Sequence, residues 1–182
     1  MEVAWRKKNV QRKRLCRKTF RRSLRPAIMA PMSTKNPSGN SPESPLLFEA
    51  NGELSLHFGF PTIQSRMIKN DPERLILDYT RTMMGFLLLQ PAPRHIAMIG
   101  LGGGSLAKYC RRTLPACAFT AVELSPEVIA LRDAFGVPAD DALFKVICAD
   151  GADFVRENPA AFDVVLVDGF NAEGQPAQLC SS

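Results

Sequence analysis

Short apolar runs alternate with helix-like segments through the second half of the chain. Each run is followed by a glycine, an acidic residue or both, as is typical of a buried strand that ends in a turn. Strands that alternate with helices predict an α/β fold with a doubly wound, mostly parallel sheet. We expect strands at 95–99, 118–123, 143–148 and 162–167, and helices at 104–113, 126–135 and 151–157.

The segment before these repeats has the shorter period of β-structure. Two alternating runs flank Asn51-Gly52, and an Asn-Gly pair between such runs is a strong hairpin signal. Residues 62–68 supply a third β-prone run. We therefore expect a small β-meander at 46–70, ahead of an α/β domain at 71–182.

A helix is expected to open the α/β domain. Asp71 fits the N-cap position, and Pro72 fits the first helical position, where its missing N–H costs nothing. The apolar spacing then continues to about Leu89, after which Pro91 and Pro93 end the helical pattern.

Charge is distributed unevenly along the 182 residues. The net charge is +5, but residues 1–31 hold 11 of the 23 Lys and Arg and only one of the 18 acids. Residues 1–45 are therefore expected to form a basic, disordered extension and linker. Three interpretations stay open for the basic part: an arm for nucleic acid or a membrane surface, an organellar presequence, or an extension without function.

The remaining composition excludes several classes of protein. Five cysteines show no paired metal-ligand spacing, and their odd number without a secretory signal favours free thiols in a reducing, cytoplasmic environment. No apolar run approaches the roughly 18 residues that a membrane span requires. We expect no metal and no membrane contact, and a homodimer is an open alternative.

Glycines concentrate directly after the first predicted strand of the α/β domain. Gly100, Gly102, Gly103 and Gly104 form a turn that leads into a helix, whose free N–H groups and positive dipole end face whatever lies over the turn. Such a turn lets the backbone approach a ligand closely. The spacing differs from the strict dinucleotide fingerprint, because Ser105 replaces the third glycine.

Acidic residues follow the other three predicted strands. Glu123 comes about 20 residues after the glycine turn, the separation at which a second-strand carboxylate reaches ribose hydroxyls. Asp150-Gly151 and Asp168 end the next two strands. Because parallel strands end at one edge of the sheet, these groups should lie together and form a nucleoside site.

The motifs in this region resemble a known family. Four segments, in the same order, are similar to those of the spermidine synthases, at residues 98–104, 121–128, 149–151 and 162–168. Spermidine synthases are polyamine aminopropyltransferases on the fold of S-adenosylmethionine-dependent methyltransferases. The resemblance extends from about residue 46 to residue 182, and it implies S-adenosylmethionine or its decarboxylated form as co-substrate and a small amine as acceptor.

The resemblance also implies roles for the nucleoside half of the site. The turn of Gly100, Gly102, Gly103 and Gly104 would face the sulfonium and ribose. Glu123 would accept hydrogen bonds from both ribose hydroxyls. Asp150, in the Asp150-Gly151 motif, would accept a hydrogen bond from the adenine amino group.

The amine half of the site follows the family less closely. Asp168 corresponds to the catalytic acid that orients and deprotonates the attacking amine, and Tyr79 lies near the family's substrate-binding tyrosine. Gly103 and Asn171, however, stand where the family has two further aspartates that hold cationic amines.

Three functions therefore stay open. The first is aminopropyl transfer from decarboxylated S-adenosylmethionine to an amine, the second is methyl transfer on the same fold, and the third is nucleoside binding without catalysis. The resemblance also implies further strands after residue 167. We accordingly expect a C-terminally truncated family member whose apolar edge strand promotes self-association and whose activity is low.

Overall fold

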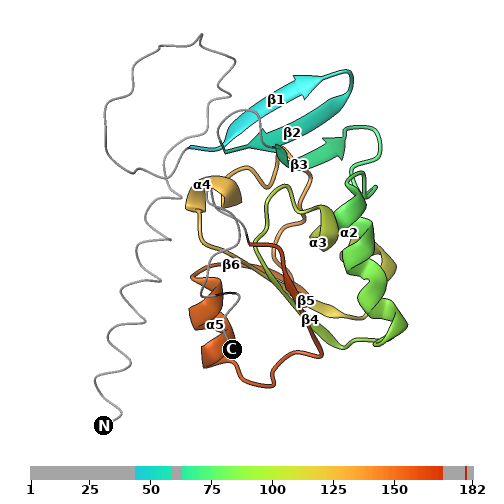
Figure 1. Ribbon diagram of the computed structural model, residues 1–182, viewed down its shortest axis with the longest axis vertical. Coiled ribbons are helices and arrows are strands. Elements are labelled where there is room, and N and C mark those ends of the chain that lie inside the picture. Colours follow the sequence, from blue (N-terminus) through green and yellow to red (C-terminus); the bar gives the residue numbers. More distant parts are fainter. Residues whose placement is uncertain (1–43, 59–62, 170–178, 180–182) are drawn as a thin grey trace, which may run out of the picture. The chain divides into compact units, whose positions relative to one another are not determined.

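Two β-sheets organise the chain (Figure 1). The computed structural model describes residues 44–58, 63–169 and 179. Almost all of the extension predicted at 1–45 lies outside these residues, as does most of the segment after Gly169. Both sheets belong to one unit, residues 43–182. One sheet is antiparallel and the other is parallel with helices around it, which confirms the predicted fold class.

The parallel sheet contains the four strands that the apolar runs predicted. Its order is β6 (Phe144–Cys148), β5 (Ala118–Glu123), β4 (His95–Ile99) and β7 (Val164–Val167). The two central strands, β4 and β5, are almost completely buried, as expected for parallel strands with both faces covered. In chain order the strands read third, second, first, fourth, so the direction of winding reverses between β4 and β7.

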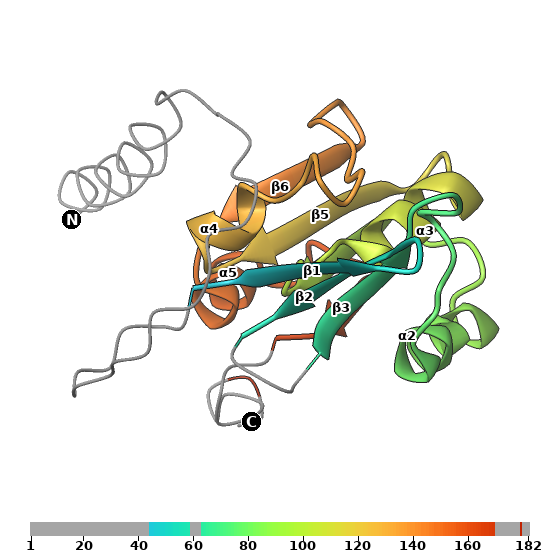
Figure 2. The same ribbon diagram turned by 90° about the horizontal axis from the view of Figure 1, so that it is seen from above.

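Helices cover the two faces of the parallel sheet. The helix α3 (Ser105–Thr113) follows β4, α4 (Pro126–Ile129) follows β5, and α5 (Gly151–Glu157) follows β6. Two views show α5 on one side of the sheet and α3 on the other, next to α2 (Asp78–Met83) (Figures 1 and 2).

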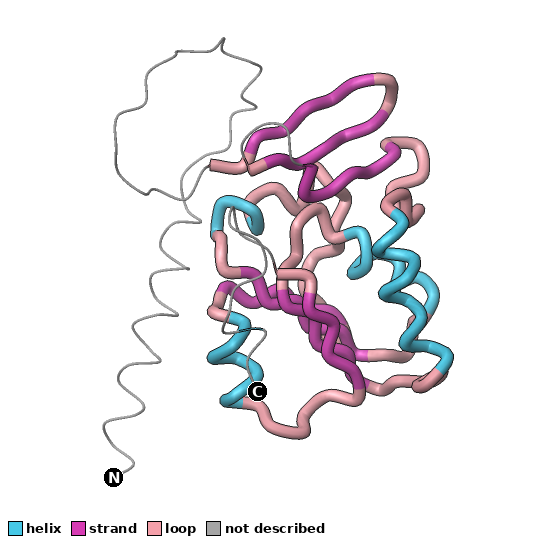
Figure 3. Tube along the Cα trace, in the orientation of Figure 1, coloured by secondary structure: helices cyan, strands magenta, loops and turns pink. Residues whose placement is uncertain are grey.

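The antiparallel sheet has the predicted hairpin at its start. Strands β1 (Leu46–Ala50) and β2 (Glu53–His57) pair across a turn in which Asn51 and Gly52 both have positive φ. That geometry matches the right-handed strand twist, which is why Asn-Gly favours it. Strand β3 (Ile63–Ile68) completes the sheet by pairing with β2. Loops run between this sheet and the parallel one (Figure 3).

The helix predicted to start at Asp71 begins later than expected. The backbone of Asp71 instead forms an isolated antiparallel bridge with Ile68, and its carbonyl accepts a hydrogen bond from the N–H of Arg74 at 3.2 Å. Asp71 therefore extends the end of β3 rather than capping a helix. The helix α2 begins at Asp78 and continues as a 3₁₀ turn, η1 (Met84–Leu88), to the predicted end.

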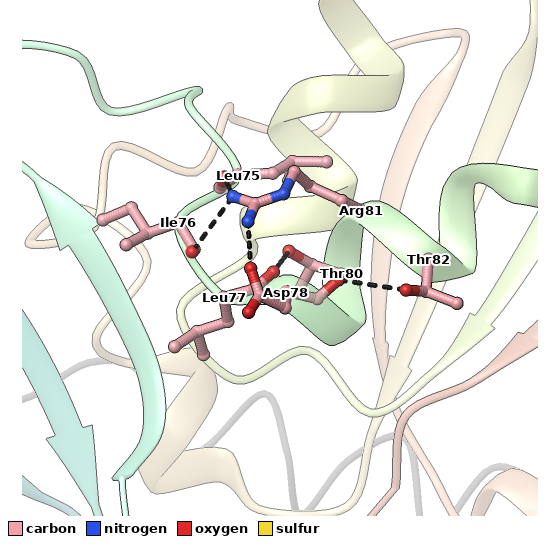
Figure 4. A network of polar contacts seen from close by, with 7 residues as sticks. All are labelled: Leu75, Ile76, Leu77, Asp78, Thr80, Arg81 and Thr82. Carbon is pink, nitrogen blue, oxygen red and sulfur yellow. Dashed lines mark hydrogen bonds and ion pairs between the residues drawn. The ribbon is translucent and has the colours of Figure 1, made fainter.

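Side chains within α2 explain where this helix starts. The guanidinium of Arg81 donates to the carbonyl oxygens of Leu75 and Ile76, at 3.0 and 3.2 Å, and pairs with the carboxylate of Asp78 (Figure 4). Thr80 Oγ1 donates to the carbonyl of Leu77 at 2.6 Å. These bonds give hydrogen-bond partners to the backbone carbonyls just before the helix, so this segment does not need to be helical. The local Asp-Pro signal does not reveal this alternative.

Two other elements are shorter than predicted. The helix after β5 ends at Ile129 instead of residue 135, and tight turns follow it, with hydrogen bonds such as Leu131 N–H to the Val128 carbonyl at 3.0 Å. These turns bring Phe135 fully into the core. The last strand begins at Val164 instead of residue 162, because Asp163 accepts the N–H groups of Arg94 and His95 and so marks the strand's start.

Candidate active site

The glycine turn between β4 and α3 lies against the end of β7. Gly100 has φ +88°, and a Cβ atom there would stand 2.4 Å from the carbonyl oxygen of Asp168. The Asp168 N–H donates to the carbonyl of Ile99 at 2.8 Å, which sets this close approach. The turn therefore requires glycine at its first position, and it holds the backbone of the predicted catalytic residue in place.

Glu123 connects the end of β5 to the same turn. Its Oε2 accepts the N–H of Leu101 at 2.8 Å, and its Oε1 accepts the N–H of Ser125 at 2.9 Å. Each carboxylate oxygen has a second lone pair, so the group can still accept hydrogen bonds from a ligand. The carboxylate is thus fixed in orientation before any ligand arrives, beside the turn where the sequence placed it.

Asp150 has a structural contact that sequence reasoning did not anticipate. Its Oδ1 accepts the N–H groups of Ala152 and Asp153, at 2.8 and 3.0 Å, so it is the N-cap of α5. A Cβ at Gly151 would lie 2.2 Å from a methyl carbon of Ile99, which explains the glycine. The Asp150-Gly151 motif therefore starts a helix and packs it on β4, and its role toward adenine stays a prediction.

Asp168 and Tyr79 are 89 positions apart in the sequence and meet in the structure. The Tyr79 hydroxyl donates to Asp168 Oδ2 at 3.3 Å. Burial raises the pKa of Asp168 from 3.8 to about 6, and the hydrogen bond from Tyr79 opposes part of that rise. The pKa of Tyr79 is raised too, first by burial and then by the Asp168 charge, so the phenol keeps its proton and serves as a donor.

These groups surround the point where the order of the parallel sheet reverses. The glycine turn follows β4 and Asp168 follows β7, and the reversal lies between these two strands. In open α/β sheets, ligands bind at the carboxyl ends of the strands at such a point. Glu123, after β5, stands on the other side of the turn. The structure thus brings Tyr79, the glycine turn, Glu123 and Asp168 to one end of the sheet.

Gly103 is enclosed by residues that carried no sequence signal. A Cβ at Gly103 would lie 2.7 Å from Phe135 Cδ1 and 2.7 Å from Ser65 Oγ. Ser65 comes from β3 and Phe135 from the turns after α4, and both are buried. An aspartate at position 103 would therefore require these neighbours to move, so restoring the family's residue there is not a simple test of amine binding.

Lys108 is a third buried residue near the turn that sequence reasoning missed, after Ser65 and Phe135. It is 2% exposed, and its Nζ lies 2.6 Å from the Phe135 carbonyl oxygen and 3.1 Å from Met67 Sδ. Burial lowers its pKa from 10.5 to about 8, partly offset by the charge of Glu73. Lys108 thus connects α3, β3 and the turn that carries Phe135. A lysine at an apolar position of the α3 pattern was the only available signal.

Within residues 44–58, 63–169 and 179, no group of three His, Cys, Asp or Glu side chains could hold a metal ion. None of the helices in that part of the chain is long and apolar enough to cross a membrane.

Comparison with known proteins locates these motifs in a family. No protein-family model matches the chain. The polyamine aminopropyltransferase of Chromobacterium violaceum is 44% identical over 153 residues, which are 84% of this chain and 54% of that protein. The chain is a homologue of polyamine aminopropyltransferases. This confirms the family resemblance of the sequence motifs, and the chain spans about half the length of the curated relatives it matches.

Two further similarities place the chain among related folds. A crystal structure of a probable spermidine synthase from Corynebacterium glutamicum superposes with a TM-score of 0.64, at 19% identity, over 80% of this chain and 56% of that one. This similarity shows the shared fold. An eEF1A lysine and N-terminal methyltransferase homolog of Drosophila melanogaster is 35% identical over 78 residues, 41% of this aminopropyltransferase homologue and 12% of that protein.

Proposed function

We propose that this aminopropyltransferase homologue binds an S-adenosylmethionine-type nucleoside and transfers an aminopropyl group from the decarboxylated form to a small amine. The observation that carries the proposal is the contact between Tyr79 and Asp168 beside the glycine turn. Asp168, a carboxylate of raised pKa, follows β7 where the sheet order reverses, and β4 lies between β7 and β5, the strand that ends in Glu123.

Binding of the nucleoside is assigned to the β4 and β5 side of the site. Glu123 accepts the two ribose hydroxyls with lone pairs that its backbone contacts leave available. The glycine turn lets the ligand approach the backbone at the start of α3. Asp150 uses Oδ1 as a helix cap, which leaves Oδ2 as the acceptor for the adenine amino group in this proposal.

The chemical step is assigned to Asp168. The amine acceptor must lose a proton, because only the neutral nitrogen has a free electron pair. That pair forms a bond to the donor carbon next to sulfur, the carbon–sulfur bond breaks, and its electrons remain on sulfur in a neutral thioether. Asp168 takes the amine proton, and its pKa of about 6 keeps it ionised and able to do so at neutral pH.

Tyr79 orients the carboxylate for this step. Its hydroxyl donates to Oδ2, so Oδ1 is the oxygen that receives the proton in this proposal. The raised pKa of Tyr79 means that the phenol does not compete for the amine proton.

Methyl transfer is the second candidate, and the similarity to the Drosophila methyltransferase homolog favours it. The two reactions use different donors and give different products. Incubation with S-adenosylmethionine or its decarboxylated form, followed by mass spectrometry of the acceptor, separates them. A nucleoside-binding protein without catalysis would bind the ligands and release neither product.

Calorimetric titration tests the nucleoside site directly. S-adenosylmethionine, its decarboxylated form and methylthioadenosine are titrated into wild type and Glu123→Ala. Loss of a charge-assisted contact to two hydroxyls should weaken each ligand by about 2 kcal/mol, close to 30-fold. Glu157→Ala, which removes a carboxylate from the end of α5, is the matched control and should bind normally. Equal affinity in wild type and Glu123→Ala would refute the site.

A further inference from the structure

Ser65 is a buried polar residue of the antiparallel sheet that lies against the glycine turn. The residue is 5% exposed. Its Oγ lies 2.7 Å from the position that a Cβ of Gly103 would take, and 4.0 Å from that of Gly102. Among the described residues, none forms a hydrogen bond with this hydroxyl. In the part of the chain that the structure describes, this oxygen is not one of the fully enclosed polar atoms that lack a partner, so it remains accessible and can form a hydrogen bond with a ligand at the turn.

The position of Ser65 is set by the packing of β3. Ser65 and Met67 are the two buried positions of β3 and lie on one face of the strand. Lys108, in the second turn of α3, reaches Met67 and the Phe135 carbonyl, which ties β3 to the helix that follows the glycine turn. The Phe135 ring also approaches this point, with its Cδ1 atom 2.7 Å from the Cβ position of Gly103. The hydroxyl is therefore held over the turn by the core.

The topology determines which part of a ligand passes this hydroxyl. Glu123 follows β5 and Asp168 follows β7, and β4 lies between these two strands. A donor whose ribose is held at Glu123 and whose reacting carbon faces Asp168 must cross the end of β4. The glycine turn is that end, and Ser65 lies over it. The group nearest Ser65 is thus the side chain on the donor's sulfur.

We infer that Ser65 is a specificity-determining contact that hydrogen-bonds the polar end of the donor's side chain. This inference rests on the proposed nucleoside site. A hydroxyl both donates and accepts hydrogen bonds. It can therefore donate to the carboxylate of S-adenosylmethionine, or accept from the amino group when the carboxylate is absent, as in the decarboxylated form. The atoms nearest to the Cβ position of Gly103 belong to Phe135 and Ser65, and both side chains are uncharged.

The test compares ligands that have the polar end with one that lacks it. Ser65→Ala removes only the hydroxyl and should weaken S-adenosylmethionine, its decarboxylated form or both by about tenfold. Methylthioadenosine, which carries a methyl group on sulfur, should bind Ser65→Ala and wild type equally. Ser55→Ala is the matched control: this serine lies in β2, its hydroxyl donates to the Phe48 carbonyl at 3.3 Å, and its loss should change no affinity.

Each outcome of these titrations has one meaning. Unchanged affinity for both polar-ended ligands, or equal weakening of all three, would overturn the role of Ser65. Failure of the proposed function looks different, because wild type would then bind no ligand or Glu123→Ala would bind all three normally, and the Ser65 inference would fall with it. Thermal melting of Ser65→Ala checks the fold, and Ser65→Cys, a weaker hydrogen-bonding group of similar shape, should give a smaller loss.

Discussion

Replacing Asp168 with asparagine is expected to stabilise the protein at neutral pH while it removes the proposed proton acceptor. In the folded state, burial raises the pKa of Asp168 from 3.8 to about 6. The native protein therefore pays a free-energy cost to keep this carboxylate ionised above pH 6. Asparagine has nearly the same shape and no charge, and its oxygen can still accept the hydrogen bond that Tyr79 donates.

The magnitude follows from the displacement of the pKa. About two pKa units correspond to about 3 kcal/mol at most, since each unit is 1.36 kcal/mol. The carboxylate is only partly buried, so we expect a gain of about 1–2 kcal/mol in the free energy of unfolding at pH 7.5. The unfolded state binds fewer protons than the native state between pH 3.8 and 6, so wild-type stability falls as pH rises through that window, and the advantage of the variant appears there.

Urea unfolding of wild type and Asp168→Asn at pH 4, 5, 6 and 7.5 measures this effect. Asp163→Asn is a control for which the opposite change in stability is expected. The backbone N–H groups of Arg94 and His95 lower the pKa of Asp163, so the ionised form of Asp163 stabilises the fold. That variant should lose stability at pH 7.5. If wild type and Asp168→Asn are equally stable at pH 7.5, or if the difference between them does not change with pH, then the Asp168 carboxylate is not buried at an energetic cost.

Two further substitutions test the surroundings of the glycine turn. Gly103→Ala should lower the free energy of unfolding by about 1–3 kcal/mol, because its Cβ would meet Phe135 and Ser65 at 2.7 Å, and a variant of normal stability in urea unfolding would contradict that geometry. Lys108→Met should remove a pH dependence of the free energy of unfolding. Burial lowers the pKa of Lys108 from 10.5 to about 8, so the stability of wild type should rise between pH 8 and 10.5. The stability of the variant should not rise in this range. Parallel curves for the two proteins in thermal melts would refute the buried-lysine explanation.

Elements with a local cause were predictable from the sequence. The Asn51-Gly52 hairpin depends on two residues that tolerate positive φ, and the strands of the parallel sheet depend on short runs of apolar residues. The glycine turn and Glu123 were found for the same reason, because their spacing along one β-α-β unit sets their distance in space. Their mutual contact, from Glu123 to the Leu101 N–H, is a consequence of that unit.

Elements with competing local signals were not predictable. The Asp71-Pro72 pair satisfies the rules for a helix start, but the bridge between Asp71 and Ile68 uses that backbone for the antiparallel sheet. The helix after β5 stops at Ile129 because the chain turns to bury Phe135. In both places tertiary hydrogen bonds or burial outweigh a local preference of the order of 1 kcal/mol.

The sequence alone determined which strand ends carry carboxylates and which turn is glycine-rich, because these follow from local pattern and topology. Only the tertiary structure decided what surrounds them. The Asp168–Tyr79 contact joins positions 89 residues apart, and the raised pKa of Asp168 comes from burial by that packing. The place of Ser65 over the glycine turn likewise depends on how the antiparallel sheet packs on α3 through Met67 and Lys108. The hydrophobic pattern of the sequence does not predict such a contact between sheets. The contact is stabilised when residues that are distant along the chain are buried together, and this depends on the tertiary structure.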